Sequence, residues 1–224
     1  MKTFLISGWA QPIDTLAQAF PNGSSVDYLN YAGCADYFKA ITPFAKEIET
    51  VVGWSLGGQI AIRAIAEGVI KPKKLILIAT PYQFVSSDDY PFGMPVENFA
   101  EFRASFIANP GKTLARFSIQ LGKGDNLAKE IIETLIAQTY SERPHTLAWL
   151  DQLRDFSCRS IDFSAFPPTI IVQGEGDTIT PFSQAAAFAA KLPKVHAEVW
   201  KFCGHVPQLH DAERLRQLAD TVFA

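Results

Sequence analysis

A single serine stands at the centre of a glycine-rich stretch, residues 53–58, which reads Gly-Trp-Ser-Leu-Gly-Gly. The β-branched residues before it are typical of a buried strand, and the alanine-rich apolar run after it is typical of a helix. Glycines at 53 and 57 complete the pattern G-x-S-x-G, in which the backbone turns sharply and exposes the serine hydroxyl. The sequence therefore predicts a nucleophilic Ser55. The alternative is a tight turn whose serine only caps the helix.

Two further candidate groups follow predicted strands later in the chain. Asp177 ends the sequence Gly-Glu-Gly-Asp after the apolar run 169–173, and His205 lies in Gly-His-Val-Pro after the last predicted strand. Because parallel strands end at one edge of a sheet, both side chains are expected beside Ser55. The order Ser55, Asp177, His205 is the one expected with this serine turn. The alternatives are an Asp177 that only forms a turn and a structural His205.

These three residues predict acyl transfer by a serine nucleophile. His205 would take the proton of Ser55, Asp177 would hold the imidazole, and the serine would attack an acyl carbonyl to form an acyl-enzyme that water hydrolyses. The backbone N–H groups of Leu56, after the serine, and of Trp9, in the loop after the first strand, are the expected oxyanion donors. No metal-ligand cluster, phosphate loop or dinucleotide fingerprint is recognisable, so no metal or cofactor is expected.

Strands and helices alternate in both halves of the chain. Continuous apolar runs predict buried strands at 4–6, 74–79 and 169–173, besides the strand before Ser55. Further strands are predicted at 25–29 and at about 199–202. This pattern predicts an α/β fold with a mostly parallel central sheet flanked by helices.

The alternation is interrupted between about residues 81 and 160, where only helical patterns occur: one with Phe99, Phe102 and Phe106 on one face, then helices at 112–121, 127–140 and 146–155. We predict a core of residues 1–80 and 161–224 with a helical cap inserted at 81–160. Phe99, Phe102, Phe106 and Phe117 are candidates to line an apolar acyl tunnel. The alternative is that most of them dock the cap on the core.

Composition excludes several classes of protein. The chain has 224 residues, of which 48% are hydrophobic and 19% charged, and a net charge of −3. This balance is globular and predicts no attraction to nucleic acid or to an anionic membrane. The three cysteines form no C-x-x-C pair, and the sequence has no apolar run of membrane-spanning length. We expect a soluble cytoplasmic protein, active as a monomer.

The motifs place the chain in a known family. It resembles the α/β hydrolases over nearly its whole length, and the stretches Ser-Gly-Trp at 7–9, Gly-Trp-Ser-Leu-Gly-Gly at 53–58 and Gly-His-Val-Pro at 204–207 resemble the pimeloyl-[acyl-carrier protein] methyl ester esterases of biotin synthesis. The resemblance implies a triad of Ser55, Asp177 and His205, with Trp9 and Leu56 at the oxyanion hole. That family usually has His where this chain has Ser7.

The resemblance also implies a substrate and a partner. The expected activity is that of a serine carboxylesterase acting on the methyl ester of pimeloyl-acyl-carrier protein, with the carrier protein bound by basic residues of the cap. Residues 81–160 hold eight Lys or Arg against ten Asp or Glu, so the cap as a whole is not basic. The alternatives are a general short-chain carboxylesterase or thioesterase, and a non-catalytic binding protein on a hydrolase scaffold.

Overall fold

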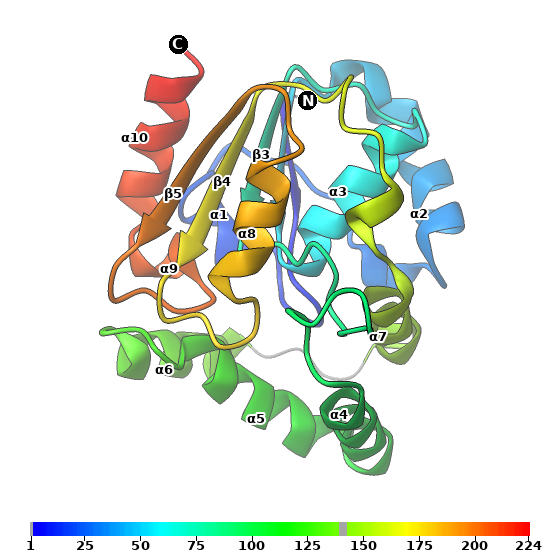
Figure 1. The fold of residues 1–224 in the computed structure, drawn as a ribbon, viewed down its shortest axis with the longest axis vertical. Helices are drawn as coiled ribbons and strands as arrows, with labels where there is room; N and C mark the ends of the chain where they lie inside the picture. The colour runs from blue at the N-terminus through cyan, green and yellow to red at the C-terminus, as the bar shows by residue number, and fades with distance from the viewer. Residues whose placement is uncertain (1, 139–142) are drawn as a thin grey trace.

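A five-stranded sheet forms the centre of the molecule. The computed structural model describes residues 2–138 and 143–224. Within these residues every neighbouring pair of strands is parallel, and the spatial order β1-β2-β3-β4-β5 is also the chain order (Figure 1). The strands are β1 (Thr3–Ile6), β2 (Thr50–Trp54), β3 (Lys74–Ile78), β4 (Thr169–Gly174) and β5 (Val195–Trp200). The predicted α/β class with a parallel sheet is confirmed.

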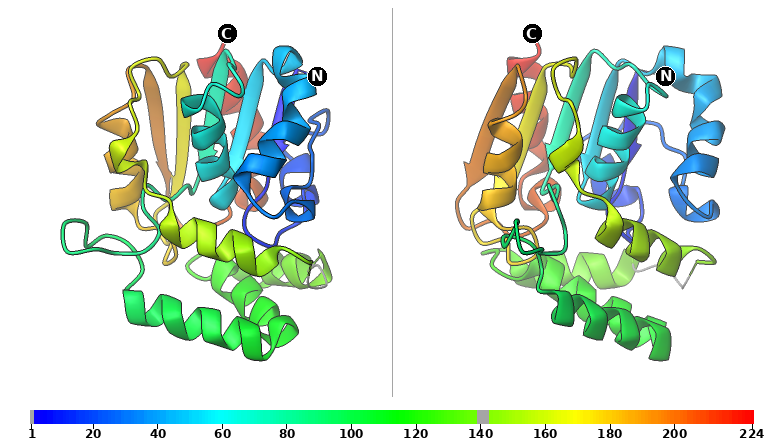
Figure 2. Two further views of the ribbon diagram at one scale, coloured as in Figure 1. Left: turned by 90° about the vertical axis from the view of Figure 1, so that its right-hand side faces the viewer. Right: turned by 45° about the vertical axis from the view of Figure 1, so that its right-hand side comes forward.

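Helices cover both faces of the sheet. Helix α3 packs on β1, β2 and β3, and α8 packs on β4 and β5, while α10 lies on the opposite face (Figure 2). The α-helices outside the insertion are α1 (Asp14–Ala17), α2 (Cys34–Ile41), α3 (Leu56–Ala66), α8 (Phe182–Ala189), α9 (Pro207–His210) and α10 (Ala212–Val222), and the 3₁₀ helices are η1 (Tyr28–Asn30), η2 (Thr42–Glu47) and η3 (Cys158–Ser160). Coverage on both faces explains why the inner strands are continuous apolar runs.

The segment between β3 and β4 forms four α-helices, besides η3, among the described residues. They are α4 (Val96–Ala108), α5 (Pro110–Gly122), α6 (Ala128–Gln138) and α7 (Thr146–Asp155). These helices lie across the carboxyl ends of the strands (Figures 1 and 2). Residues 139–140 of the predicted helix 127–140 lie outside the described residues. The helical insertion therefore covers the sheet edge at which Ser55, Asp177 and His205 were expected.

The prediction of a strand at 25–29 is wrong. Ser24 makes one isolated bridge to Phe4 of β1, and the chain then leaves the sheet. The carboxylate of Asp27 accepts the backbone N–H of Leu29 at 3.0 Å, which starts η1, and the Tyr28 hydroxyl donates to the carbonyl oxygen of Gly8 at 2.7 Å. A local side-chain bond to the backbone thus replaces the sheet bonds of an edge strand.

The last strand lies earlier than predicted. β5 spans Val195–Trp200 instead of beginning near 199. Its side chains are mostly exposed or half-buried because it is an edge strand, and polar residues such as His196 and Glu198 interrupt the apolar run. A search for continuous apolar runs finds buried strands and misses edge strands of this kind.

An ion pair joins the first and last helices of the insertion. Arg103 of α4 donates to both carboxylate oxygens of Asp151 of α7, at 2.7 and 2.9 Å. The hydrogen bond from this guanidinium, followed by its charge, lowers the pKa of Asp151 below the ordinary 3.8. A lowered pKa means that the pair stabilises the fold above the ordinary value and that this stabilisation is lost as the pH falls through the folded-state pKa.

We therefore expect Arg103→Gln to lower the melting temperature at neutral pH and to have a progressively smaller effect as the pH falls below 3.8, the ordinary pKa of this carboxyl group. Thermal unfolding of both proteins across this pH range measures the difference. Arg116→Gln removes the same charge from α5 without touching the pair and is the control. A difference between Arg103→Gln and the unsubstituted protein that stays constant with pH would contradict the assignment.

Candidate active site

Ser55 occupies a sharp turn between β2 and α3. Its backbone has φ 54° and ψ −120°, a strained conformation for a residue with a side chain. The Ser55 N–H donates to the carbonyl oxygen of Ile78 on β3 at 2.9 Å. A Cβ at Gly57 would overlap the backbone carbonyl of Ile6, so helix α3 starts in direct contact with β1. The G-x-S-x-G pattern thus produces the strand-to-helix turn that was predicted for it.

Close packing at Gly57 makes a stability prediction. Gly57→Ala must push apart two backbone segments, and we expect a loss of about 3 kcal/mol or more. For a chain of this size that is a decrease of roughly 6–12 °C in melting temperature. Gly111→Ala is the matched control, because no heavy atom lies within 4 Å of a Cβ placed there. If Gly57→Ala and the control Gly111→Ala had the same melting temperature, the turn would tolerate a side chain at position 57.

Asp177 and His205 form a buried pair at the carboxyl ends of β4 and β5. The Nδ1 atom of His205 lies 2.8 Å from Oδ2 of Asp177, and the side chains are 1% and 0% exposed. Oδ1 of Asp177 accepts the backbone N–H groups of Ile179 and Thr180, both at 2.8 Å, and Oδ2 also accepts Nε2 of Gln173 at 2.7 Å. Three N–H donors therefore fix the carboxylate in position, and the carboxylate fixes the imidazole.

The other nitrogen of His205 is free to accept a proton. Since the carboxylate of Asp177 accepts from Nδ1, a neutral imidazole carries its lone pair on Nε2. This Nε2 atom is buried and has no hydrogen-bond partner among residues 2–138 and 143–224. A buried polar atom without a partner is costly in a protein unless its partner arrives with substrate or moves during function. This arrangement is the one required of a general base.

Trp54 connects His205 to the serine turn. Its indole N–H donates to the carbonyl oxygen of His205 at 2.9 Å, and the two ring centroids are 6.0 Å apart. Because Trp54 directly precedes Ser55, this bond holds the histidine loop beside the serine. The structure thus brings the three predicted triad residues to one edge of the sheet, with Ser55 itself 6% exposed.

The two predicted oxyanion donors come from the serine turn and from the loop after β1. Leu56 is the first residue of α3, a position at which a helix leaves its N–H groups without an intrahelical acceptor. The loop after β1 is held by the Tyr28 hydroxyl on Gly8 and by the Ser7 hydroxyl, which donates to the carbonyl oxygen of Gln11 at 2.5 Å. The Ser7 side chain therefore stabilises the loop by a hydrogen bond to a backbone carbonyl of the same loop.

Aromatic rings of the helical insertion pack around Trp9. The centroids of Phe102, Phe106 and Phe117 lie 5.5, 5.3 and 5.3 Å from that of Trp9, and the Trp9 indole donates to the carbonyl oxygen of Thr146 at 2.9 Å. Phe99 packs instead on Phe84, with centroids 6.3 Å apart. These contacts join the helical insertion to the loop after β1. Lining of an acyl tunnel by the four phenylalanines stays a prediction.

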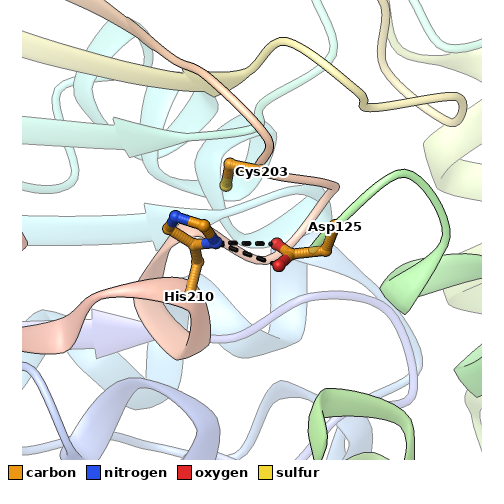
Figure 3. Close-up of side chains that lie close together, drawn as sticks. All are labelled: Asp125, Cys203 and His210. Atoms are coloured by element: carbon orange, nitrogen blue, oxygen red, sulfur yellow. Dashed lines mark hydrogen bonds and ion pairs between the residues drawn. The ribbon is translucent and has the colours of Figure 1, made fainter. Parts of the chain in front are cut away.

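A second cluster of polar side chains lies close to the loop that carries His205. Asp125, Cys203 and His210 hold their ligand-type atoms within 4.8 Å of one another (Figure 3). His210 Nδ1 lies 3.0 and 3.1 Å from the two carboxylate oxygens of Asp125. Burial, followed by the charges of Asp125 and Asp177, raises the pKa of the Cys203 thiol, which therefore stays protonated. The Asp125 carboxylate also accepts the backbone N–H of Gly204, so the cluster forms part of a hydrogen-bond network.

Comparison with known proteins identifies the family. The alpha/beta hydrolase family model matches residues 5–218. The chain belongs to the α/β hydrolase family. The predicted enzyme class, a hydrolase, and the resemblance stated from the motifs are thereby confirmed.

Several proteins with similar sequences are named pimeloyl-[acyl-carrier protein] methyl ester esterase. The pimeloyl-[acyl-carrier protein] methyl ester esterase of Nitrosomonas europaea is 29% identical over 177 residues, covering 77% of this chain and 70% of the relative. The protein of that name from Aromatoleum aromaticum is 29% identical over 192 residues (82% and 77%), and that from Chromobacterium violaceum is 30% identical over 189 residues (83% and 73%).

Solved structures share the fold of this chain at low sequence identity. An esterase from Exiguobacterium antarcticum has a TM-score of 0.85 at 20% identity, covering 100% of this α/β hydrolase and 92% of that chain. A bromoperoxidase from Bacillus anthracis has a TM-score of 0.84 at 17% identity, covering 99% of this chain and 91% of that chain.

Within the described residues, no helix is long and apolar enough to cross a membrane.

The sequence patterns did not predict a role at the site for two polar residues, Gln173 and Asp125. Gln173 donates from Nε2 to Oδ2 of Asp177, and Asp125 accepts the backbone N–H of Gly204 at 2.9 Å. Gln173 ends a predicted strand four residues before Asp177, so its position at the strand end was a usable signal. Asp125 lies 52 residues from Asp177 in the insertion, and no local pattern connects it to the site.

Proposed function

We propose that this α/β hydrolase is a serine carboxylesterase with Ser55 as nucleophile, His205 as general base and acid, and Asp177 as the residue that orients His205. The observation that carries the proposal is the buried Asp177–His205 pair with its unpartnered Nε2, held by Trp54 beside the strained turn of Ser55. Strain, burial and an unpartnered base at one sheet edge are features of a catalytic site.

The reaction follows from these groups. Ser55 Oγ attacks the ester carbonyl carbon and passes its proton to Nε2 of His205, while the N–H groups of Leu56 and Trp9 stabilise the oxyanion. The intermediate collapses as the leaving alkoxide takes the proton from His205 and departs as an alcohol. Water then attacks the acyl-enzyme and gives one proton to Nε2 of His205. As the second tetrahedral intermediate collapses, His205 returns that proton to Ser55 Oγ and the acid is released.

The proposed substrate is the methyl ester of pimeloyl-acyl-carrier protein. Its support is the shared name of the relatives and the Gly-Trp-Ser-Leu-Gly-Gly motif at 53–58. In this proposal residues 81–160 form a cap over the acyl chain and residues 1–80 and 161–224 form the catalytic core. The apolar rings of Phe102, Phe106 and Phe117 would provide the surface against which the acyl chain lies.

Charge pairing on the cap favours a second candidate. Arg103 is paired with Asp151, Arg154 with Asp155 and Asp151, and Arg159 with Asp89. Cations already paired with carboxylates bind an acidic carrier protein less strongly, because the pairs must be broken or shared. A carboxylesterase or thioesterase acting on small free acyl esters is therefore the alternative substrate assignment for the same site.

Hydrolysis of pimeloyl-carrier-protein methyl ester and of free dimethyl pimelate by the purified protein distinguishes the two. A higher kcat/KM for the carrier-bound ester supports the favoured substrate, and equal or higher values for the free ester support the alternative. Ser55→Ala is the control in both assays. If neither ester nor a matched thioester is hydrolysed in a Ser55-dependent manner, the proposed function is wrong.

A further inference from the structure

The turn between cap helices α5 and α6 contacts the loop that carries His205. The carboxylate of Asp125 accepts the backbone N–H of Gly204 at 2.9 Å, one residue before His205. The backbone N–H of Asn126 donates to the carbonyl oxygen of Phe202 at 2.9 Å. Phe202 has φ 57°, a left-handed conformation that is unfavourable for an aromatic residue and is maintained here by its surroundings.

The same turn also contacts the loop that carries Asp177. Gly124, with φ +85°, packs so closely on Gly176 that a Cβ on either residue would overlap the backbone carbonyl of the other. The two site loops contact each other as well, because the N–H of Gly176 donates to the carbonyl oxygen of Cys203 at 2.8 Å. The turn is thus in contact with the acid loop and the base loop at once.

The Asp125 carboxylate is itself fixed from three sides. Oδ1 accepts the backbone N–H of Leu127 at 2.8 Å, and Oδ2 accepts the N–H of Gly204. His210 Nδ1 lies against both oxygens (Figure 3). The Asp125 side chain is 0% exposed. A buried carboxylate held in this way is a rigid attachment for the loop, since removing it leaves the Gly204 N–H without its acceptor.

We propose that Asp125 is a positioning residue for His205: through Gly204 it attaches the histidine loop to the cap and holds the imidazole against Asp177 and toward Ser55. This role rests on the proposed function, in which His205 is the base. It assigns the cap a part in aligning the triad in addition to covering the substrate. A displacement of reacting groups by about 1 Å can lower a rate about 10²-fold.

Asp125→Asn is the test. An amide at this position retains one acceptor for Leu127 and presents a donor or a shared oxygen to Gly204, so the Gly204 bond is lost or weakened. We expect kcat for ester hydrolysis to fall about 10- to 100-fold with KM changed less than about threefold. Labelling of Ser55 by a fluorophosphonate should slow by the same factor as kcat. The low-field proton NMR signal of the His205 Nδ1–H should shift or broaden.

Two further variants serve as controls. Asp162→Asn changes a carboxylate that accepts a backbone N–H two residues on, at 2.9 Å, in an exposed loop, and should behave as the unsubstituted protein. Asp125→Ser retains an oxygen able to form the local turn to Leu127 but is too short to reach Gly204. It should reproduce the loss in kcat even if Asp125→Asn fails to fold.

The outcomes separate this inference from the proposed function. Unchanged kcat, labelling rate and NMR signal in the folded Asp125 variants, with Ser55-dependent hydrolysis in the unsubstituted protein, would overturn the inference and leave the proposed function standing. If the unsubstituted protein hydrolyses no ester, the proposed function is wrong, and the NMR signal alone still reports whether Asp125 holds the His205–Asp177 pair. A fall in melting temperature without any change in kcat or the NMR signal would mean that Asp125 is only structural.

Discussion

Replacing Ser55 with alanine is expected to lower kcat for ester hydrolysis roughly 10⁴- to 10⁶-fold, because the acyl-enzyme can no longer form. Any residual rate would come from substrate binding and from the N–H groups of Leu56 and Trp9. The fold should persist, since alanine can replace serine at φ 54° without adding atoms to the turn. Steady-state hydrolysis and fluorophosphonate labelling measure the loss.

The control for this variant is Ser164→Ala, which removes a hydroxyl from an exposed loop between η3 and β4. It should retain full activity and the same labelling. Circular dichroism and thermal unfolding establish that both proteins are folded. If folded Ser55→Ala retained more than about a tenth of the activity, a Ser nucleophile at this position could not explain the reaction.

Replacing Asp177 with asparagine is expected to lower kcat about 10⁴-fold with little change in KM. The amide oxygen can still accept the N–H groups of Ile179 and Thr180, so the loop should keep its shape. The amide nitrogen, however, would donate to Nδ1 of His205 and place the imidazole proton on Nε2. That nitrogen could then no longer take the proton of Ser55.

Hydrolysis rates and the low-field NMR signal of the His205 Nδ1–H test this expectation together. The signal should disappear in Asp177→Asn, because Nδ1 becomes an acceptor. Asp162→Asn, which makes the same chemical change in an exposed loop, should alter neither measurement. Retention of both the signal and the rate in Asp177→Asn would mean that another group orients His205.

Local sequence was sufficient to predict the serine turn and the buried strands. Glycine at position 57 is required by contact with the backbone of β1, and an apolar run such as Leu75–Ile78 is buried on both faces of the sheet. Both requirements act within a few residues, so they leave a pattern in the sequence. The placement of Asp177 and His205 after strands was predictable for the same reason, because parallel strands end at one edge.

Edge elements depended on the tertiary structure. The segment at 25–29 has a strand-like composition, but Asp27 bonds to the backbone of Leu29 and the chain turns away from β1. β5 carries polar residues because one side of it faces no further strand among the described residues. In both cases the neighbours of the segment, and not its own composition, decide between sheet and loop.

The sequence by itself determined the family, the parallel α/β core and the order of the three candidate catalytic residues. Only the tertiary structure revealed that Trp9 packs among phenylalanines of the helical insertion and that Asp125 reaches the backbone of Gly204. Contacts between residues so distant in the chain depend on how the helical insertion packs on the sheet. A turn or a strand follows from short-range sterics and hydrogen bonding, whereas a contact across 79 residues follows from the packing of the whole fold.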